Sequence, residues 1–281
     1  MLMKQLDMSR NVIAGRDTFV MAGQQTITQL IKSLFSNGEQ GFFYDPNDLT
    51  TMFQDAAGTI PVTAAGQPVG LVKDKSGRNN HAYQTTSAAR PILRKNATTG
   101  AYYLAFDGVD DFLQTNNIDF TSTDEISIFS GVTKLRDSTS AILVELSATT
   151  LNFNGSFHID APSGQPLNNY GSASRGTTRQ VARAGANYAA PSSVVINLKA
   201  KISSDMLRLS VNGILAAASD ADQGAGNYGN YPLYIGNRGY TSQPFTGHIY
   251  GLIGIGKLTT DSETTTMEKE LAKRVGVTLN V

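Results

Sequence analysis

The sequence predicts an all-β domain, an antiparallel sandwich, with one helix near each end. Three observations lead to this fold class. Between the two helical segments, apolar residues either alternate with polar ones or form short runs, as they do in β-strands. Glycine accounts for 27 of the 281 residues and separates these runs as turn residues do. The pair Asn212-Gly213 lies between two such runs and favours the type I′ turn of a β-hairpin.

Residues 1 to 40 form the predicted N-terminal segment. Residues 1 to 21 contain many apolar side chains without helical or strand period, which predicts an arm that becomes ordered on a partner surface. A helix is expected from about residue 24 to 35, ending before Asn37-Gly38. Its apolar stripe consists of Ile27, Leu30, Ile31, Leu34 and Phe35. Because this helix precedes the sandwich, we expect the stripe to bind a neighbouring subunit as an attachment or oligomerisation surface.

Residues 41 to 281 are expected to form one sandwich. Its clearest strands, in chain order, are YYLAF, DFLQT, EISIFSGVTKL, SAILVEL, LNFNGSFHI, LRLSV with its hairpin partner ILAAAS, YPLYIGN and GHIYGLIGIG. The stretch from Gly155 to Gly185 is the richest in turn residues and is predicted to be mostly loop. Glycines in the last strand indicate a bulge or the close approach of another layer.

A second helix is expected from about Asp261 to Val275. Thr260 and Glu263 have the spacing of a capping box, and Gly276 follows the last helical residue. The apolar stripe of Met267, Leu271 and Val275 predicts that one face of this helix packs along the sandwich.

Composition excludes several classes of function. Charged residues make up 16% of the chain and cancel to a net charge of zero, so neither nucleic acid nor an anionic membrane is an expected partner. The absence of cysteine excludes disulfides, thiolate metal sites and a cysteine nucleophile. No run of 18 apolar residues occurs, and charges interrupt the N-terminus where a signal peptide is apolar. We therefore expect a soluble protein without a classical export signal.

The stretch YYLAFDGVDDFL places Asp107, Asp110 and Asp111 around Gly108 between two strands. One interpretation is a turn in which Asp107 accepts backbone N–H groups and glycine takes a positive φ. The alternative is a calcium site, because carboxylates and turn carbonyls suit a hard cation. The alternating spacing of a dedicated calcium loop is missing, which favours the turn.

The stretch KDKSGRNNHA, residues 73 to 82, allows two interpretations as well. Asp74 and Ser76 are typical of a turn that is fixed by side-chain bonds to the backbone. The exposed donors of such a loop would also suit a glycan. The candidate glycan contacts here are Lys75, Arg78, Asn79, Asn80 and His81.

Aromatic residues near the end of the chain extend this second hypothesis. Tyr228, Tyr231 and Tyr240 could form a patch on which sugars stack, or they could belong to the core. The chain has no tryptophan, the strongest sugar platform, which weakens the case for a lectin.

Catalysis has little support in the sequence. His81, His158 and His248 have no hydrolase or metalloprotease signature beside them, and strand alternation predicts His158 at a surface or strand edge. Glycoside hydrolysis requires paired carboxylates, whereas SAILVEL offers Glu145 alone. We therefore predict a protein that is not an enzyme, with no catalytic residue and no cofactor other than the calcium considered above.

Eight segments, taken in order, resemble the laminin-G-like, concanavalin A-like jelly-roll proteins of tailed bacteriophages and prophages. They are YDPNDLTTMFQD, GQPVGLVKDKSGRNNHAYQ, ARPILR, YYLAFDGVDDFL, LRLSVNG, YIGNRG, PFTGHIYGLIGIGKLTTDSE and LAKRVGV, and they cover residues 41 to 281. The fold implied by this resemblance is a concanavalin A-like jelly roll. Because one sandwich serves many functions, the resemblance specifies the fold more closely than the role.

The resemblance implies a virion component, either a capsid-decorating protein or part of a head or tail fibre. The expected partners are the major capsid protein or a fibre or tail subunit, and the family's habit favours a homotrimer. The alternative function is a glycan-binding adhesin that contacts the bacterial surface. A glycan-degrading enzyme is the second alternative.

Overall fold

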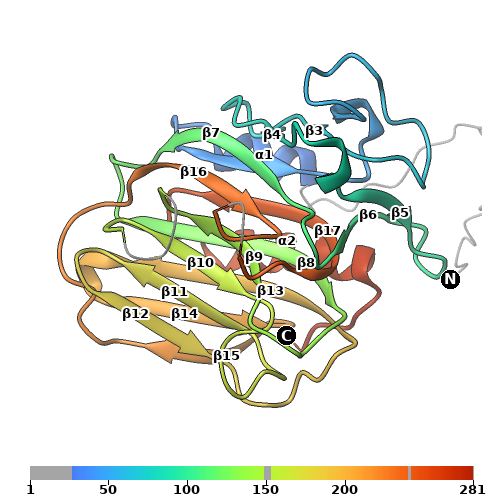
Figure 1. Cartoon of the computed structure of the whole chain (residues 1–281). Helices are drawn as coiled ribbons and strands as arrows, with labels where there is room; N and C mark the ends of the chain where they lie inside the picture. The colour runs from blue at the N-terminus through green and yellow to red at the C-terminus, as the bar shows by residue number, and fades with distance from the viewer. Residues whose placement is uncertain (1–26, 149–152, 240–241, 281) are drawn as a thin grey trace, which may run out of the picture.

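The computed structural model describes residues 27–148, 153–239 and 242–280. It contains two antiparallel β-sheets that pack face to face as a sandwich, with one helix at each end of the described chain (Figure 1). The predicted fold class, an all-β jelly-roll sandwich with a C-terminal helix, is confirmed. The predicted arm, residues 1 to 21, lies outside the described residues.

The first sheet, sheet A, has eight strands in the order β15-β14-β13-β8-β17-β6-β5, with β1 also paired to β17. Its strands are β1 Gly41–Tyr44, β5 Ile92–Lys95, β6 Tyr102–Asp107, β8 Glu125–Lys134, β13 Ser192–Lys201, β14 Met206–Val211, β15 Ile214–Ser219 and β17 Thr246–Ile255.

The second sheet, sheet B, has nine strands in the order β12-β11-β10-β9-β16-β7-β4-β3-β2. Its strands are β2 Met52–Phe53, β3 Leu71–Val72, β4 Ala82–Tyr83, β7 Leu113–Asp119, β9 Ile142–Leu146, β10 Phe157–Asp160, β11 Gly171–Arg175, β12 Arg179–Arg183 and β16 Asn230–Ile235. Three of these strands, β10, β11 and β12, lie between Gly155 and Gly185, so the prediction of a loop there missed β11 and β12, although turns and irregular segments still make up more than half of the stretch. Its short strands alternate with many turn residues, and the turn residues dominate the sequence pattern.

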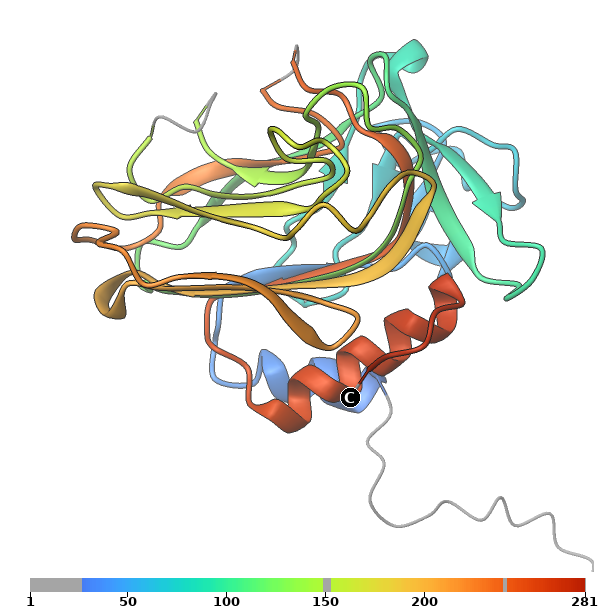
Figure 2. The same ribbon diagram turned by 90° about the horizontal axis from the view of Figure 1, so that it is seen from below.

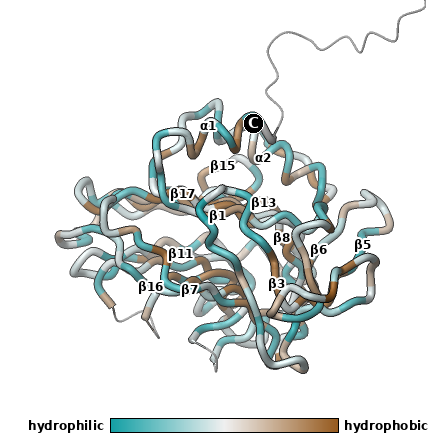
Figure 3. Tube along the Cα trace, turned by 90° about the horizontal axis from the view of Figure 1, so that it is seen from above, coloured by the Kyte–Doolittle hydropathy of each residue, from teal (hydrophilic) through white to brown (hydrophobic). Residues whose placement is uncertain are grey.

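The main core lies between the two sheets and is built by strand alternation. Leu207, Leu209 and Val211 of β14 point into it, while the residues between them face outward. The predicted hairpin follows, with Asn212 and Gly213 at φ values of 51° and 84°, the positive angles of a type I′ turn. Along the chain trace, hydrophobic stretches concentrate in the interior and hydrophilic ones mostly at the periphery (Figure 3).

Helix α2, Asp261–Val275, begins and ends as its sequence predicts. Thr260 accepts a hydrogen bond from the Glu263 N–H, and the Glu263 carboxylate accepts one from the Thr260 N–H. The helix packs on the outer face of sheet A, where a Cβ at Gly251 would lie 3.1 Å from Leu271. Glycine in β17 therefore allows this close approach, and a bulge occurs at the same place in its register.

Helix α1, Ile27–Leu34, also packs on sheet A, beside α2 (Figure 2). Leu30, Ile31, Leu34 and Phe35 are buried against Phe43, Phe129, Val195, Ile253, Ile255, Met267, Leu271 and Ala272. The prediction that this stripe is an attachment or oligomerisation surface was therefore wrong for these four residues, because the same chain covers them. The side chain of Ile27 lies outside the described residues. Neither of the described helices is long enough to cross a membrane.

Candidate functional site

The DGVDD stretch forms the predicted turn, and it links the two sheets, since β6 belongs to sheet A and β7 to sheet B. The Asp107 carboxylate accepts hydrogen bonds from the N–H groups of Val109 at 2.7 Å and Asp110 at 3.4 Å. Gly108 has a φ of 76°, and a Cβ there would lie 1.8 Å from Thr246 Oγ1. A larger residue at position 108 is thus excluded by both conformation and space.

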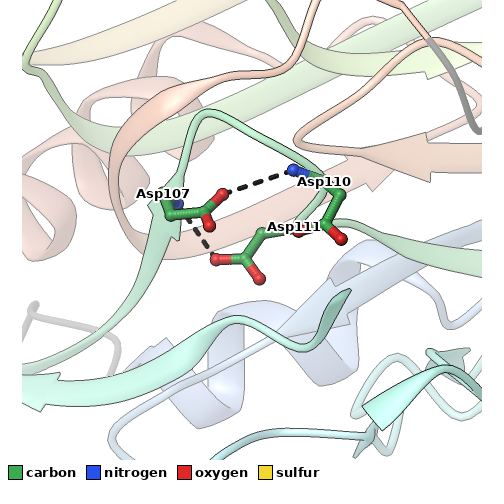
Figure 4. A group of neighbouring side chains, drawn as sticks. All are labelled: Asp107, Asp110 and Asp111. Atoms are coloured by element: carbon green, nitrogen blue, oxygen red, sulfur yellow. Dashed lines mark hydrogen bonds between the residues drawn. The ribbon is translucent and has the colours of Figure 1, made fainter. Parts of the chain in front are cut away.

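The same turn brings three carboxylates together (Figure 4). One oxygen each from Asp107, Asp110 and Asp111 lies within 4.8 Å of the others, and Asp111 also accepts the Asp107 N–H at 3.0 Å. Burial raises the pKa of Asp111 to about 6, and the charges of Asp107 and Asp110 add to this rise. Oxygen donors so placed suit a hard cation. Calcium binding at this turn stays a prediction.

Asp111→Asn is expected to stabilise the calcium-free protein at pH 7. The pKa of Asp111 is raised from its ordinary value of 3.8 to about 6 in the folded protein. Between these two pH values the folded protein keeps a proton that the unfolded chain has lost, so the free energy of unfolding falls as the pH rises through this range. The variant cannot ionise and keeps an oxygen for the Asp107 N–H. Its free energy of unfolding in a chelator should exceed the parent's by at most ~3 kcal/mol at pH 7, with no gain below about pH 4.

Asp110→Asn is the comparison variant: Asp110 is exposed, and removing its charge relieves only part of the rise in the pKa of Asp111, so this variant should gain less stability than Asp111→Asn. Calcium should raise the melting temperature of the parent and not that of Asp111→Asn. An equal calcium response in both proteins would exclude Asp111 as a ligand.

The KDKSGRNNHA loop is fixed by Asp74, as the structural interpretation predicts. The carboxylate accepts hydrogen bonds from the N–H groups of Phe43, Ser76 and Asn80 and from the Ser76 hydroxyl. The candidate glycan contacts mostly bind their own chain. Lys75 pairs with Asp45 and Asp48, Arg78 donates to the carbonyls of Phe35 and Glu39, Asn80 donates to Gln40 and Gly41, and His81 accepts the Asp74 N–H. Asn79 alone of the five is exposed.

The predicted aromatic patch does not form from the described residues. Tyr228 is buried and its hydroxyl bonds to Ser174, so it was wrongly placed among the glycan contacts. Tyr231 is half-buried and donates to the Asn154 carbonyl at 3.0 Å. Tyr240 lies outside the described residues. Spacing alone does not reveal that Tyr228 points into the core.

A different polar cluster lies on the outer face of sheet B. Glu145 of β9 and His158 of β10 are paired across the two strands, and both are fully buried. His158 Nε2 lies 3.1 Å from Asp160 Oδ2, and Ser163 donates to the same carboxylate at 3.0 Å. Burial would raise the pKa of Asp160, but adjacent His158, Ser163 and Arg238 together lower it. Asp160 is therefore a stable carboxylate within the cluster.

Three arginines surround these carboxylates, and we call Arg179, Arg183 and Arg238 the arginine cluster. Arg238 donates to Glu145 at 2.8 Å, and Arg183 donates to the Ser163 hydroxyl at 3.2 Å. Partial burial lowers the pKa of Arg179, and the positive charges of Arg183 and Arg238 lower it further. The negative charge of Asp160 raises the same pKa and so offsets part of this decrease. The three arginines therefore surround one small region. Their three positive charges exceed the two negative charges of Glu145 and Asp160 by one.

Arg179 differs from the other two arginines. Its side chain is partly covered but keeps exposed surface, and it makes no hydrogen bond or ion pair within the described part of the chain. Its five N–H donors therefore have no acceptor among the described residues, and they lie beside two positive neighbours. A planar guanidinium group whose donors are unoccupied can bind a carboxylate through two parallel hydrogen bonds.

The prediction that His158 lies at a surface or strand edge was wrong. Strand alternation correctly places His158 on the opposite face of the strand from Phe157. The segments after β10 and β16 fold back over that outer face and bury His158, as the contacts of Ser163 and Arg238 show. Glu145 is covered as well, because Arg238 and Ser147 each donate a hydrogen bond to its carboxylate. A carboxylate so enclosed holds arginines in place and does not face a substrate.

The arginine cluster was not predicted from the sequence. One local signal was present, since Arg179 and Arg183 are four residues apart on strand β12, and strand alternation puts both on one face. The remaining member, Arg238, is 93 residues from its partner Glu145, so only the fold brings it there.

No protein-family model matches the sequence, and no curated protein shows significant sequence similarity to it. Solved structures do resemble the fold. One is from botulinum neurotoxin type C, whose cell entry depends on two ganglioside molecules; it is 9% identical, has a TM-score of 0.56, and the match covers 84% of this chain and 52% of that one. The receptor-binding domain of botulinum neurotoxin D is also 9% identical, with a TM-score of 0.53 and coverages of 71% and 50%.

A third similar structure is the CBM40 domain of the Ruminococcus gnavus IT-sialidase, bound to α2,3-sialyllactose. It is 18% identical with a TM-score of 0.41, and the match covers 54% of this chain and 97% of that one. The match to the neurotoxin chains spans about half of their length. At these identities the likeness establishes the β-sandwich fold alone.

Proposed function

We propose that this protein is a glycan-binding domain and that the arginine cluster binds an acidic sugar through its carboxylate. The observation that carries the proposal is Arg179, a guanidinium that makes no hydrogen bond or ion pair in the described chain and lies next to Arg183 and Arg238. Sialic acid is the sugar that we expect, because its carboxylate fits the planar donor pair of a guanidinium.

The buried carboxylates support this proposal by fixing the cluster. Glu145 fixes Arg238, while Asp160 holds the Ser163 hydroxyl that accepts from Arg183. The donors that bind a ligand are then oriented in advance, which lowers the entropy cost of binding. Both helices cover sheet A, so neither occupies this face of sheet B (Figure 2).

The neighbouring folds also support a glycan ligand. The neurotoxin type C structure concerns ganglioside binding, and a related neurotoxin binding domain with a TM-score of 0.52 is in complex with a sialylated ligand. This accords better with the adhesin alternative than with a purely structural role. We propose no catalysis, because the neurotoxin structures that resemble this fold concern receptor binding and ganglioside interaction.

Arg179→Ala is expected to weaken the binding of sialyllactose by about tenfold or more, since a hydrogen bond to a charged group contributes ~1.5–3 kcal/mol. Isothermal titration measures this, with lactose as the neutral counterpart that lacks the carboxylate. The melting temperature should stay near that of the parent, because Arg179 has no partner in the described chain.

Arg94→Ala is the matched control, an exposed arginine on strand β5 of the other sheet. It should leave the affinity for sialyllactose unchanged. The proposal fails if the parent binds sialyllactose no more tightly than lactose, or if the two arginine variants lose the same affinity.

We also propose, from the eight resembling sequence segments, that the domain is displayed on a virion, where it would contact host glycans. The stripe of α1 is covered by its own sandwich, so attachment to other virion subunits would use a different surface. Mass spectrometry of purified, tail-stripped capsids tests this location: the protein should be present in particles and absent from mock preparations.

A further inference from the structure

An open pocket of about 510 Å³ lies beside the arginine cluster. Three segments distant in sequence form its walls. They contribute the hydroxyls of Ser138, Thr139 and Ser140, then Gly164 and Gln165, and finally Gln243. Volumes of this size are typical of small-ligand sites.

The walls of this pocket are joined by backbone hydrogen bonds. Ala141 donates to Pro162 at 2.9 Å, and Ile142 donates to Gln243 at 2.9 Å. At the other end of the first wall, Asp137 pairs with the buried Lys134 and accepts the Ala190 N–H at 2.6 Å. The three walls therefore form one connected structure, which is formed before any ligand arrives.

Gln243 is the unusual residue of the pocket. Its Oε1 atom is buried and has no hydrogen-bond partner among the residues that the structure describes. Its φ of 56° lies in the left-handed region, which few residues other than glycine adopt. A buried acceptor without a donor is costly in a folded protein, and backbone outliers concentrate at ligand sites. Gln243 lines the pocket, so a turn of its side-chain amide would present this oxygen to a sugar hydroxyl, which would supply the missing donor.

The pocket adjoins the arginine cluster through Gly164. A Cβ at this position would lie 3.8 Å from Nη2 and 3.9 Å from Nε of Arg183. One ligand can therefore reach both places, with its acidic sugar at the arginines and the next sugar in the pocket.

We infer that the pocket is a second subsite, which takes a neutral sugar linked to the acidic one, and that Gln243 accepts a hydrogen bond from a hydroxyl of that sugar. The exposed hydroxyls of Ser138 and Thr139 have no partner in the described chain and add further donors and acceptors. This inference rests on the proposed function and extends it: the ligand is an acidic oligosaccharide.

The test compares sialyllactose with the methyl glycoside of sialic acid by isothermal titration. Gln243→Met is nearly isosteric and removes the acceptor, so it should weaken sialyllactose binding by about three- to tenfold. Affinity for the methyl glycoside, which reaches the arginines alone, should not change. Thr139→Val, an exposed substitution that preserves side-chain shape, is the second variant and should show the same selective loss.

The two proposals fail in different ways. The subsite is overturned if Arg179→Ala loses both ligands while Gln243→Met and Thr139→Val keep the parent's affinity for sialyllactose. It is also overturned if these variants lose both ligands equally with unchanged melting curves, because the pocket would then not distinguish the second sugar. Failure of the parent to bind either ligand overturns the proposed function itself.

Discussion

Leu34→Ala should lower the free energy of unfolding by ~2–5 kcal/mol, the range for removing a fully buried leucine side chain. Leu34 has no exposed surface and packs in the cluster that joins α1 to α2 and to the outer face of sheet A. In a domain of this size each kcal/mol changes the melting temperature by roughly 2–4 °C. Thermal unfolding followed by circular dichroism measures the loss.

Lys32→Ala is the control within the same helix, because Lys32 is exposed and its removal should change little. Sedimentation should give the same oligomeric state for Leu34→Ala and the parent below the melting temperature. Unchanged melting together with a changed oligomeric state would restore the intersubunit interpretation of the stripe.

The features that the sequence predicted well are those decided by neighbouring residues. The alternation of Leu207, Leu209 and Val211 depends on the residues of a single strand. The Asn212-Gly213 turn depends on two adjacent residues. The carboxylates of the DGVDD turn were also found in this way, because five consecutive residues carry them. In each case the local backbone decides the outcome.

The features that the sequence could not predict depend on which layer covers a given face. The stripe of α1 was recognised, but periodicity does not say whether its partner belongs to the same chain or to another. Alternation placed His158 on the outer face without revealing the segments that cover it. The pairing of Arg238 with Glu145 joins distant residues, so the arginine cluster exists only after folding.

Asp74→Ala should be the most damaging change in the KDKSGRNNHA loop. The carboxylate accepts the Phe43 N–H at 2.8 Å, and the backbone N–H of Lys75 donates to the Phe43 carbonyl at 2.9 Å, so the loop pairs with the free edge of β1. Alanine leaves the Phe43 N–H without an acceptor on a buried strand. We expect a loss of roughly 3 kcal/mol in the free energy of unfolding, measured by urea denaturation.

Asp74→Asn should lose less than this, because one oxygen can still accept from the N–H groups of Phe43 and Ser76 while the new amide faces the Asn80 N–H. Asp55→Ala is the matched control: Asp55 accepts three hydrogen bonds, all from Thr59 and Ile60 in its own surface turn. Its loss should be much smaller than that of Asp74→Ala, because water replaces those bonds. If Asp55→Ala and Asp74→Ala are equally destabilised, the edge of β1 does not depend on this loop. Undiminished binding of sialyllactose by Asp74→Ala, measured while it is folded, would separate the structural loop from the arginine cluster.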